Sequence, residues 1–142
     1  MSNITQLHPQ KPEAFNSESE LYFNVWERPC YFRGSMTSTK DNYYEDPYHK
    51  HIVRMWNGEP TSIGLVGKNY KLLKNRVLGE GVEDIFMETL TQTELKDVTR
   101  HDRISYMGGT CLRDYIFPSI RTDIGSKQSD IAFRAIIVNG YD

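Results

Sequence analysis

Basic residues gather between residues 67 and 76, and this stretch is the part of the sequence best suited to bind a charged ligand. The set, which includes one aromatic residue, is Lys68, Tyr70, Lys71, Lys74 and Arg76. Cationic side chains bind phosphates and release counterions, and an aromatic ring offers a face on which a base can stack. With Arg100 and Arg103 farther along the chain, the run predicts contact with single-stranded nucleic acid. The alternative is a solvated turn before a helix, with later arginines paired to Asp102, Asp114 and Asp123.

Tyrosines mark a second candidate contact region. Residues 35–50 carry turn-forming residues and mixed charge, which predicts a long exposed loop. Three of its tyrosines are candidate protein-interface residues, because tyrosine is enriched at binding hot spots. These residues are Tyr43, Tyr44 and Tyr48.

Histidines and cysteines offer weaker chemistry. His49 and His51 would face the same way on a strand and could share a metal ion. A third ligand would have to fold back from Glu45, Asp46 or His101, so exposed histidines before a strand are the favoured interpretation. Cys30 and Cys111 are predicted to be reduced, buried thiols, because the sequence shows no secretory signal.

Motifs that would indicate catalysis or cofactor binding are missing from the sequence. It contains no nucleophile elbow, no metal-hydrolase motif and no phosphate-binding loop. We therefore predict no catalytic residue, no cofactor and no metal, and we expect that the protein is not an enzyme. The acidic residues Glu80, Glu83, Asp84 and Glu88 are interpreted as the solvated face of a helix.

Length and charge restrict the remaining classes. The chain has 142 residues and a formal charge of −2, which excludes a polybasic nucleic-acid binder but leaves room for a local patch. No apolar run approaches the roughly 20 residues of a membrane span. The amino-terminal segment lacks the apolar core of a signal peptide. These features predict a cytoplasmic protein with no membrane partner.

The order of the elements predicts an α+β fold with a mostly antiparallel sheet and one main amphipathic helix packed on it. Residues 1–20 are expected to be a flexible arm, and 21–142 a single domain. A strand is predicted near 21–34, with Pro29 at a sheet edge. A hairpin is predicted from 51–56 and 61–67, around Asn57-Gly58 and a loop slightly longer than two residues.

The predicted helix carries an apolar stripe at helical spacing, formed by Val77, Leu78, Val82, Ile85, Phe86 and Leu90. A short second helix is expected in 91–103. Strand segments follow around a Gly108-Gly109 turn, and a last strand covers 131–138. Because that strand runs directly into Asn139-Gly140, we expect it to lie at a sheet edge, to pair with another subunit, or to continue into a longer protein.

Residues 48–78 resemble the phage/plasmid-like protein family (domain of unknown function 932). The similar positions are Ile52, Val53, Arg54, Gly64, Val66, Gly67, Tyr70 and Asn75, and those of a final Asn-Gly-Tyr-Asp sequence at 139–142. Family members usually continue beyond that Asp. The resemblance covers roughly residues 21–142 and implies an origin in a mobile genetic element; the family has no settled biochemical activity.

Two functional hypotheses follow from these features. The first is a bacteriophage protein that binds single-stranded nucleic acid in the cytoplasm of a bacterial host. It would be a recombination or annealing accessory that forms homo-oligomers. The alternative is a protein–protein interaction module that inhibits a host defence or replication factor.

Overall fold

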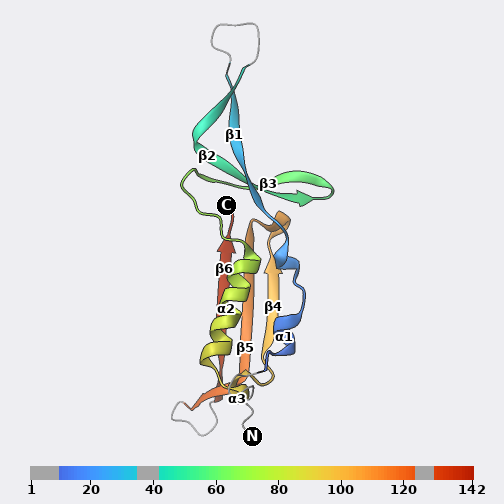
Figure 1. Cartoon of the computed structure of the whole chain (residues 1–142), viewed down its shortest axis with the longest axis vertical. Helices are drawn as coiled ribbons and strands as arrows, with labels where there is room; N and C mark the ends of the chain where they lie inside the picture. The colour runs from blue at the N-terminus through green and yellow to red at the C-terminus, as the bar shows by residue number, and fades with distance from the viewer. Residues whose placement is uncertain (1–9, 35–41, 124–129) are drawn as a thin grey trace, which may run out of the picture.

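Two three-stranded antiparallel sheets follow one another along the long axis of the molecule (Figure 1). The computed structural model describes residues 10–34, 42–123 and 130–142, and the side chains of 121–131 are not described. One long helix covers a face of the second sheet. The predicted α+β fold with antiparallel pairing is therefore confirmed.

The first sheet has the order β1-β2-β3, formed by Trp26–Gly34, Asn42–Trp56 and Glu59–Gly67. The predicted hairpin is β2 and β3. Its turn is only two residues long, because Asn57 and Gly58 both adopt positive φ (50° and 81°) and Trp56 pairs directly with Glu59. The longer loop expected from Pro60 does not form, since a proline is tolerated on an edge strand such as β3.

The outer half of the β1–β2 hairpin projects beyond the rest of the sheet. β3 ends at Gly67, opposite His49, whereas Tyr31–Gly34 continue to pair with Asn42–Glu45. We call the segments 30–34 and 42–48 the arm (Figure 1). Residues 42–50 are therefore strand and not loop, and 35–41 lie outside the described residues. The prediction of a loop underestimated the β propensity of the tyrosines.

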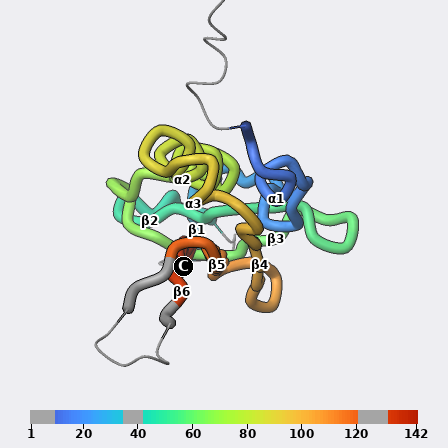
Figure 2. Tube along the Cα trace, turned by 90° about the horizontal axis from the view of Figure 1, so that it is seen from below, coloured from blue at the N-terminus to red at the C-terminus, as the bar shows by residue number. Residues whose placement is uncertain are grey.

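The second sheet has the order β4-β5-β6, formed by Thr99–Ile104, Thr110–Asp123 and Asp130–Gly140. Helix α2 (Asn75–Thr89) covers one face of β5 and β6, as Figure 2 shows from the end of the molecule. The short helices α3 (Gln92–Leu95) and η3 (Tyr106–Gly108) flank β4. The last strand is an edge strand, which is the first of the three expected arrangements.

The orientation of α2 differs from the prediction. Val77 and Ile85 were expected in the apolar stripe, but they are 61% and 56% exposed. Glu83 was expected in solvent, but it is only 3% exposed and lies against the sheet. The buried face runs through Asn75, Gly79 and Glu83, because the sheet offers cationic partners to the glutamate. Apolar periodicity alone could not show this.

Residues before 21 also differ from the prediction. Helix α1 (Glu13–Asn16) and the 3₁₀ turn η2 (Glu20–Tyr22) pack on the body of the domain. The ring of Phe15 is buried, with its centroid 5.8 Å from that of Tyr115. A flexible N-terminal arm was predicted for residues 1–20, and only its residues 1–9 lie outside the described part of the chain. The segment is attached by the buried Phe15 ring and by hydrogen bonds from Arg100 to the Ser17 carbonyl and from Ser19 to Asp102, and no periodic pattern in the sequence indicates these contacts.

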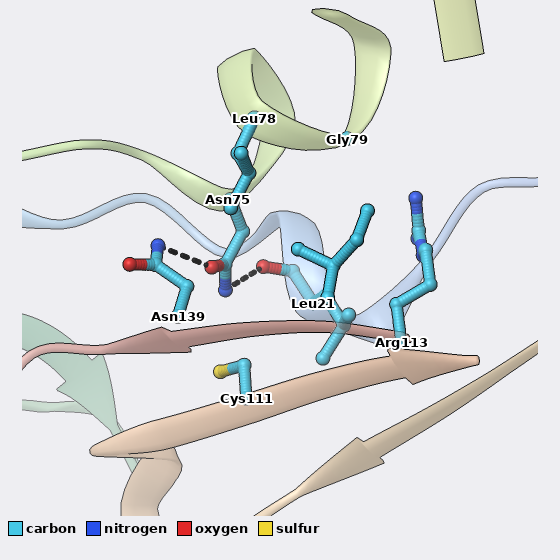
Figure 3. A pocket seen from close by; sticks show the side chains of 8 residues that line it. Leu21, Asn75, Leu78, Gly79, Cys111, Arg113 and Asn139 are labelled. Carbon is cyan, nitrogen blue, oxygen red and sulfur yellow. Dashed lines mark hydrogen bonds between the residues drawn. The ribbon is translucent and has the colours of Figure 1, made fainter. Parts of the chain in front are cut away.

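The two sheets meet at a junction built around Tyr141, which is fully buried. Its hydroxyl accepts a hydrogen bond from the Asn75 amide at 3.0 Å. The Asn75 side chain donates to the Leu21 carbonyl at 2.8 Å and accepts from Asn139 at 2.9 Å (Figure 3). Each of these buried polar groups thus has a partner.

Most positions that carry the family resemblance lie at this junction. Arg54 stacks on Phe23 at 3.6 Å and donates to the Met107 carbonyl at 3.2 Å. Gly64 touches the Tyr141 backbone. Together with Tyr70, Asn75 and Asn139, these residues have a structural role in joining the two sheets. None of the helices in the described part of the chain has the length and apolarity to cross a bilayer.

Candidate nucleic-acid interface

The basic run forms the irregular link between β3 and α2. The Tyr70 amide donates to the Gly67 carbonyl at 2.9 Å, and Asn139 donates to the Leu73 carbonyl at 2.8 Å. The link is therefore held in place at both ends. Lys68 and Lys71 are exposed, and their ammonium groups form no hydrogen bond or ion pair with the described residues. They are the cations of the link that have no such partner within the described chain.

Tyr70 does not serve as the predicted stacking platform. Its ring packs against the core of the first sheet, and its hydroxyl donates to the Gly140 carbonyl at 2.9 Å. Burial raises the pKa of the phenol. Since the ring supports the junction between the sheets, a base could not stack on it without disrupting the fold.

Arg100 is a second correction to the predicted set. Its guanidinium is buried and donates to Glu83 at 3.0 Å and to the Ser17 carbonyl at 2.6 Å. Both interactions hold it under α2. A phosphate in solution therefore cannot reach it.

The remaining predicted cations lie on different surfaces. Arg76 is half-exposed and pairs with Glu80 at 3.3 Å and with Glu18 at 3.4 Å. Lys74 donates to Asn24 at 3.0 Å. Arg103 is exposed on β4 and is paired with Leu112 of β5. Directly paired residues point to the same face of a sheet, and Leu112 points away from α2, so Arg103 does as well. The structure therefore does not unite Arg103 with the basic link.

The arm brings the predicted tyrosines next to the basic link. The Lys68 amide donates to the Tyr48 carbonyl at 2.8 Å. Tyr48 itself is 75% exposed, and Tyr43 and Tyr44 are exposed farther along the arm. The Tyr44 ring stacks on Phe32 with centroids 5.8 Å apart. The tyrosines predicted as a protein interface thus adjoin the lysines predicted as a nucleic-acid site.

A shallow hollow of about 230 Å³ lies where the arm leaves the body, between a bulge in β1 and Lys68. Two of its acids are paired, Glu27 with Lys50 at 2.8 Å and Asp46 with His49 at 2.9 Å. A hydrogen bond from the Tyr48 amide lowers the pKa of Asp46. The Lys50 ammonium offsets the charge of Glu27, whereas the Asp46 carboxylate stays charged beside the hollow.

The expected pairing of later arginines with Asp102 and Asp114 is confirmed for Arg113 and Arg134. Sequence analysis missed that the Arg113–Asp102 pair belongs to a charge network with Glu83 that is buried under α2. Arg113 donates to Asp102 at 2.7 Å, to the Tyr22 hydroxyl at 2.6 Å and to Glu83 at 3.2 Å. Glu83 also accepts from the Tyr115 hydroxyl at 2.7 Å. Gly79, one turn before Glu83, makes room for it, since a methyl group there would lie 2.8 Å from Arg113.

Two hollows adjoin the network. One, lined by Leu21, Cys111 and Arg113 among others, measures about 20 Å³ and could hold roughly one water molecule (Figure 3). The other is open, measures about 380 Å³ and is lined by Ser17, Arg100 and Asp102 among others. Although burial acts to raise it, hydrogen bonds from Arg113 and Ser19 hold the pKa of Asp102 below its usual value. We interpret the network as a support that fixes α2 on the sheet.

The chain was compared with family models, with curated proteins and with solved structures. None of them matches it. The resemblance to the phage/plasmid-like family therefore stays a prediction.

Metal and thiol chemistry find no support in the described residues. His49 and His51 bond to Asp46 and Ser62, respectively, and no group of three metal-ligating residues occurs among the residues that the structure describes. Cys111 is buried and Cys30 is half-buried, and both are free thiols. Burial raises the pKa of the Cys111 thiol, so it is a poor nucleophile.

The buried tyrosines predict a loss of stability in alkali. Burial raises the pKa of Tyr141 to about 12, whereas a phenol in the unfolded chain ionises near pH 10. Above pH 10 the unfolded state releases a proton that the folded state keeps, so the free energy of unfolding should fall between pH 10 and about 12. Urea denaturation across that range tests this. The fall should be shallower for Tyr141→Phe, and equal slopes for the two proteins would contradict the prediction.

Proposed function

We propose that this protein binds single-stranded nucleic acid across the basic link and the adjoining base of the arm. The observation that carries the proposal is the backbone hydrogen bond between Lys68 and Tyr48. It brings the backbone of Lys68, an exposed cation, next to that of Tyr48, an exposed aromatic residue. Proteins that bind single strands without sequence preference combine aromatic rings, on which bases stack, with cationic side chains that bind the phosphates.

Two further properties of the surface support the proposal. Lys68 and Lys71 make no ion pair with any described residue, so binding a phosphate would break no internal contact. Tyr48 takes over the stacking role that Tyr70 cannot fill. The site binds rather than catalyses in this proposal, since the described residues near it form no nucleophile–base pair.

The biological setting remains a proposal based on the family resemblance. We propose a mobile-element protein, such as a bacteriophage recombination or annealing accessory, that acts in the cytoplasm of a bacterial host as a homo-oligomer. Coating of a single strand suits this role, because several copies can bind side by side along one backbone.

Removing the two free lysines tests the proposal. The double variant Lys68→Gln/Lys71→Gln should bind a labelled single-stranded oligonucleotide more weakly at low salt. It should also lower the slope of log affinity against log salt by about 0.7 for each lysine, because fewer counterions are released. The matched control is Lys11→Gln/Lys96→Gln, which removes the same charge from exposed lysines near α1 and α3.

A stacking variant completes the experiment. Tyr48→Ala should weaken binding by about 1–3 kcal/mol, the range measured for a stacked base. Tyr106→Ala is its control, because Tyr106 is a similarly exposed tyrosine near Trp56, away from the link. The proposal fails if the intact protein does not bind the oligonucleotide at low salt, or if test and control variants bind alike.

A protein partner is the second candidate, and the stacked Phe32–Tyr44 pair favours it. This pair lies on the arm, and its two rings are half-exposed next to Gly34, where a methyl group would lie 2.9 Å from Tyr44. A rigid aromatic pair of this kind is a typical anchor in a protein interface. Binding of a purified host replication or defence protein that is lost in Phe32→Ala, with oligonucleotide binding unchanged, would support this candidate.

A further inference from the structure

The hollow at the base of the arm adjoins the proposed binding surface and is large enough for more than solvent. Its volume is about 230 Å³, whereas the small cavity beside Arg113 measures about 20 Å³ and could hold roughly one water molecule. Residues of β1, of β2 and of the basic link line it, among them Pro29, Asp46 and Lys68. A group bound here would therefore touch both the arm and the link.

The hollow lies at an irregularity in the pairing of β1 with β2. Pro29 pairs with Lys50 and Tyr31 pairs with Glu45, so one residue of β1 lies opposite the four residues 46–49 of β2. Bulges interrupt the regular alternation of side chains and are frequent beside functional sites. In this protein the irregular segment begins with a residue that lines the hollow, Asp46.

Asp46 is a charged hydrogen-bond acceptor held in a fixed position. One of its carboxylate oxygens accepts from the Tyr48 amide at 2.7 Å, and the other bonds to the His49 ring at 2.9 Å. Each oxygen can accept a further hydrogen bond, and the side chain is 23% exposed, so a ligand can reach it. Of the other carboxylates that line the hollow, Glu27 is neutralised by an ion pair and Glu45 is fixed by none of the described residues.

The charges around the hollow favour an uncharged ligand group that carries hydrogen-bond donors. A phosphate in the hollow would meet the charged Asp46 carboxylate. A cationic side chain of a protein partner would instead meet Arg28 and Lys68, two exposed cations that also line the hollow and have no ion pair with the described residues. A nucleobase has no net charge, and its strand keeps its phosphates available to the lysines of the link.

We propose that the hollow binds one base of the single strand and that Asp46 makes this base guanine. Unstacked bases are recognised by hydrogen bonds to their Watson–Crick edges. On this edge guanine presents two adjacent donors, N1–H and the 2-amino group, which match the two oxygens of a carboxylate. Adenine and cytosine present one donor beside an acceptor, and thymine presents one donor between two acceptors. The inference depends on the proposed function, because it assigns a base preference to the same surface.

Tyr48 and the link supply the contacts to the rest of the strand. Tyr48 follows Asp46 by two residues and is 75% exposed, so a base next to the bound guanine can stack on it. Lys68 lines the hollow and bonds through its backbone to Tyr48, which places a cation for the neighbouring phosphates. The preference for guanine is therefore added to binding that does not depend on sequence.

Fluorescence-anisotropy titrations of the intact protein with three short strands test the proposal. The first strand is an oligothymidine, the second has one central guanine, and the third has inosine at that position, which lacks the 2-amino group. The guanine strand should bind about fivefold or more tightly than the oligothymidine, because a two-bond contact to a base discriminates by at least this factor. The inosine strand should have an intermediate affinity.

Asp46→Asn is the decisive variant, because asparagine can still accept from the Tyr48 amide but no longer offers two acceptor oxygens. In this variant the guanine strand and the oligothymidine should bind alike. Glu59→Gln removes the same charge at the other end of the β2–β3 hairpin, and it should keep the preference. Circular dichroism checks that both variants are folded.

The outcomes separate this inference from the proposed function. If the intact protein binds none of the three strands, the proposed function is wrong and the base site is wrong with it. If the protein binds all three strands with equal affinity, or if the preference for guanine persists in Asp46→Asn, only the base site is wrong. A preference lost equally in Asp46→Asn and Glu59→Gln would also overturn the role of Asp46.

Discussion

Replacing Arg113 by methionine is expected to lower the free energy of unfolding by about 3–5 kcal/mol, the cost of removing one partner from a buried ion pair. Arg113 is buried and is the group that joins Asp102, Glu83 and Tyr22. Methionine preserves much of its volume but leaves Asp102 without its main counter-charge. Urea denaturation with an unchanged slope should show the loss as a lower midpoint.

Arg134→Met is the matched control, because Arg134 pairs with an aspartate of the same sheet but lies at the surface. Exposed ion pairs are screened by water, so this variant should be far less destabilised. If the two variants lose similar stability, the network under α2 does not hold the helix on the sheet. The fold would then depend mainly on the apolar contacts of Phe86 with Tyr115 and Phe117.

Gly64→Ala is expected to be the most damaging single-methyl change, with a loss of about 3 kcal/mol or more. A methyl group at residue 64 would lie 1.6 Å from the Tyr141 carbonyl oxygen, which is a backbone atom and cannot rotate away. The junction between the sheets would have to open to admit it. Thermal and urea denaturation would both show the loss.

The control for this change lies three residues along the same strand. A methyl group on Gly67 meets nothing within 4 Å, so Gly67→Ala should stay within about 0.5 kcal/mol of the unmodified protein. Equal stability of the two alanine variants would mean that the C-terminal residues do not pack on β3. The account of the junction would then be wrong.

Much of the fold could be predicted because local signals agreed with tertiary packing. Asn57-Gly58 fixed the hairpin, and the helix and the last strand lie where periodicity placed them. The arm was missed because its paired residues, such as Tyr43 and Tyr44, are flanked by turn-forming residues. The arm is stabilised by the pairing of β2 with β1, and the local sequence pattern does not show this pairing.

The candidate site was harder to predict, because exposure is decided by contacts between distant segments. Tyr70 and Glu83 have the residue types of surface groups, but one bonds to Gly140 and the other to Arg113. Tyr70 is half-buried and Glu83 is buried, and each bonds to a partner at least 30 residues away. Conversely, Tyr48 and Lys68 are 20 residues apart in the chain, and only the β2–β3 pairing brings them together.

Photochemical cross-linking is the most direct test of the proposed binding surface. A single-stranded oligonucleotide carrying halogenated uracil would be irradiated with the intact protein at low salt, and the modified peptides would be identified by mass spectrometry. The account predicts adducts at Tyr48 or elsewhere in the arm and within the link that carries Lys68 and Lys71. Adducts confined to other surfaces, such as that around Arg103, or no adducts under conditions in which the oligonucleotide is bound, would contradict it.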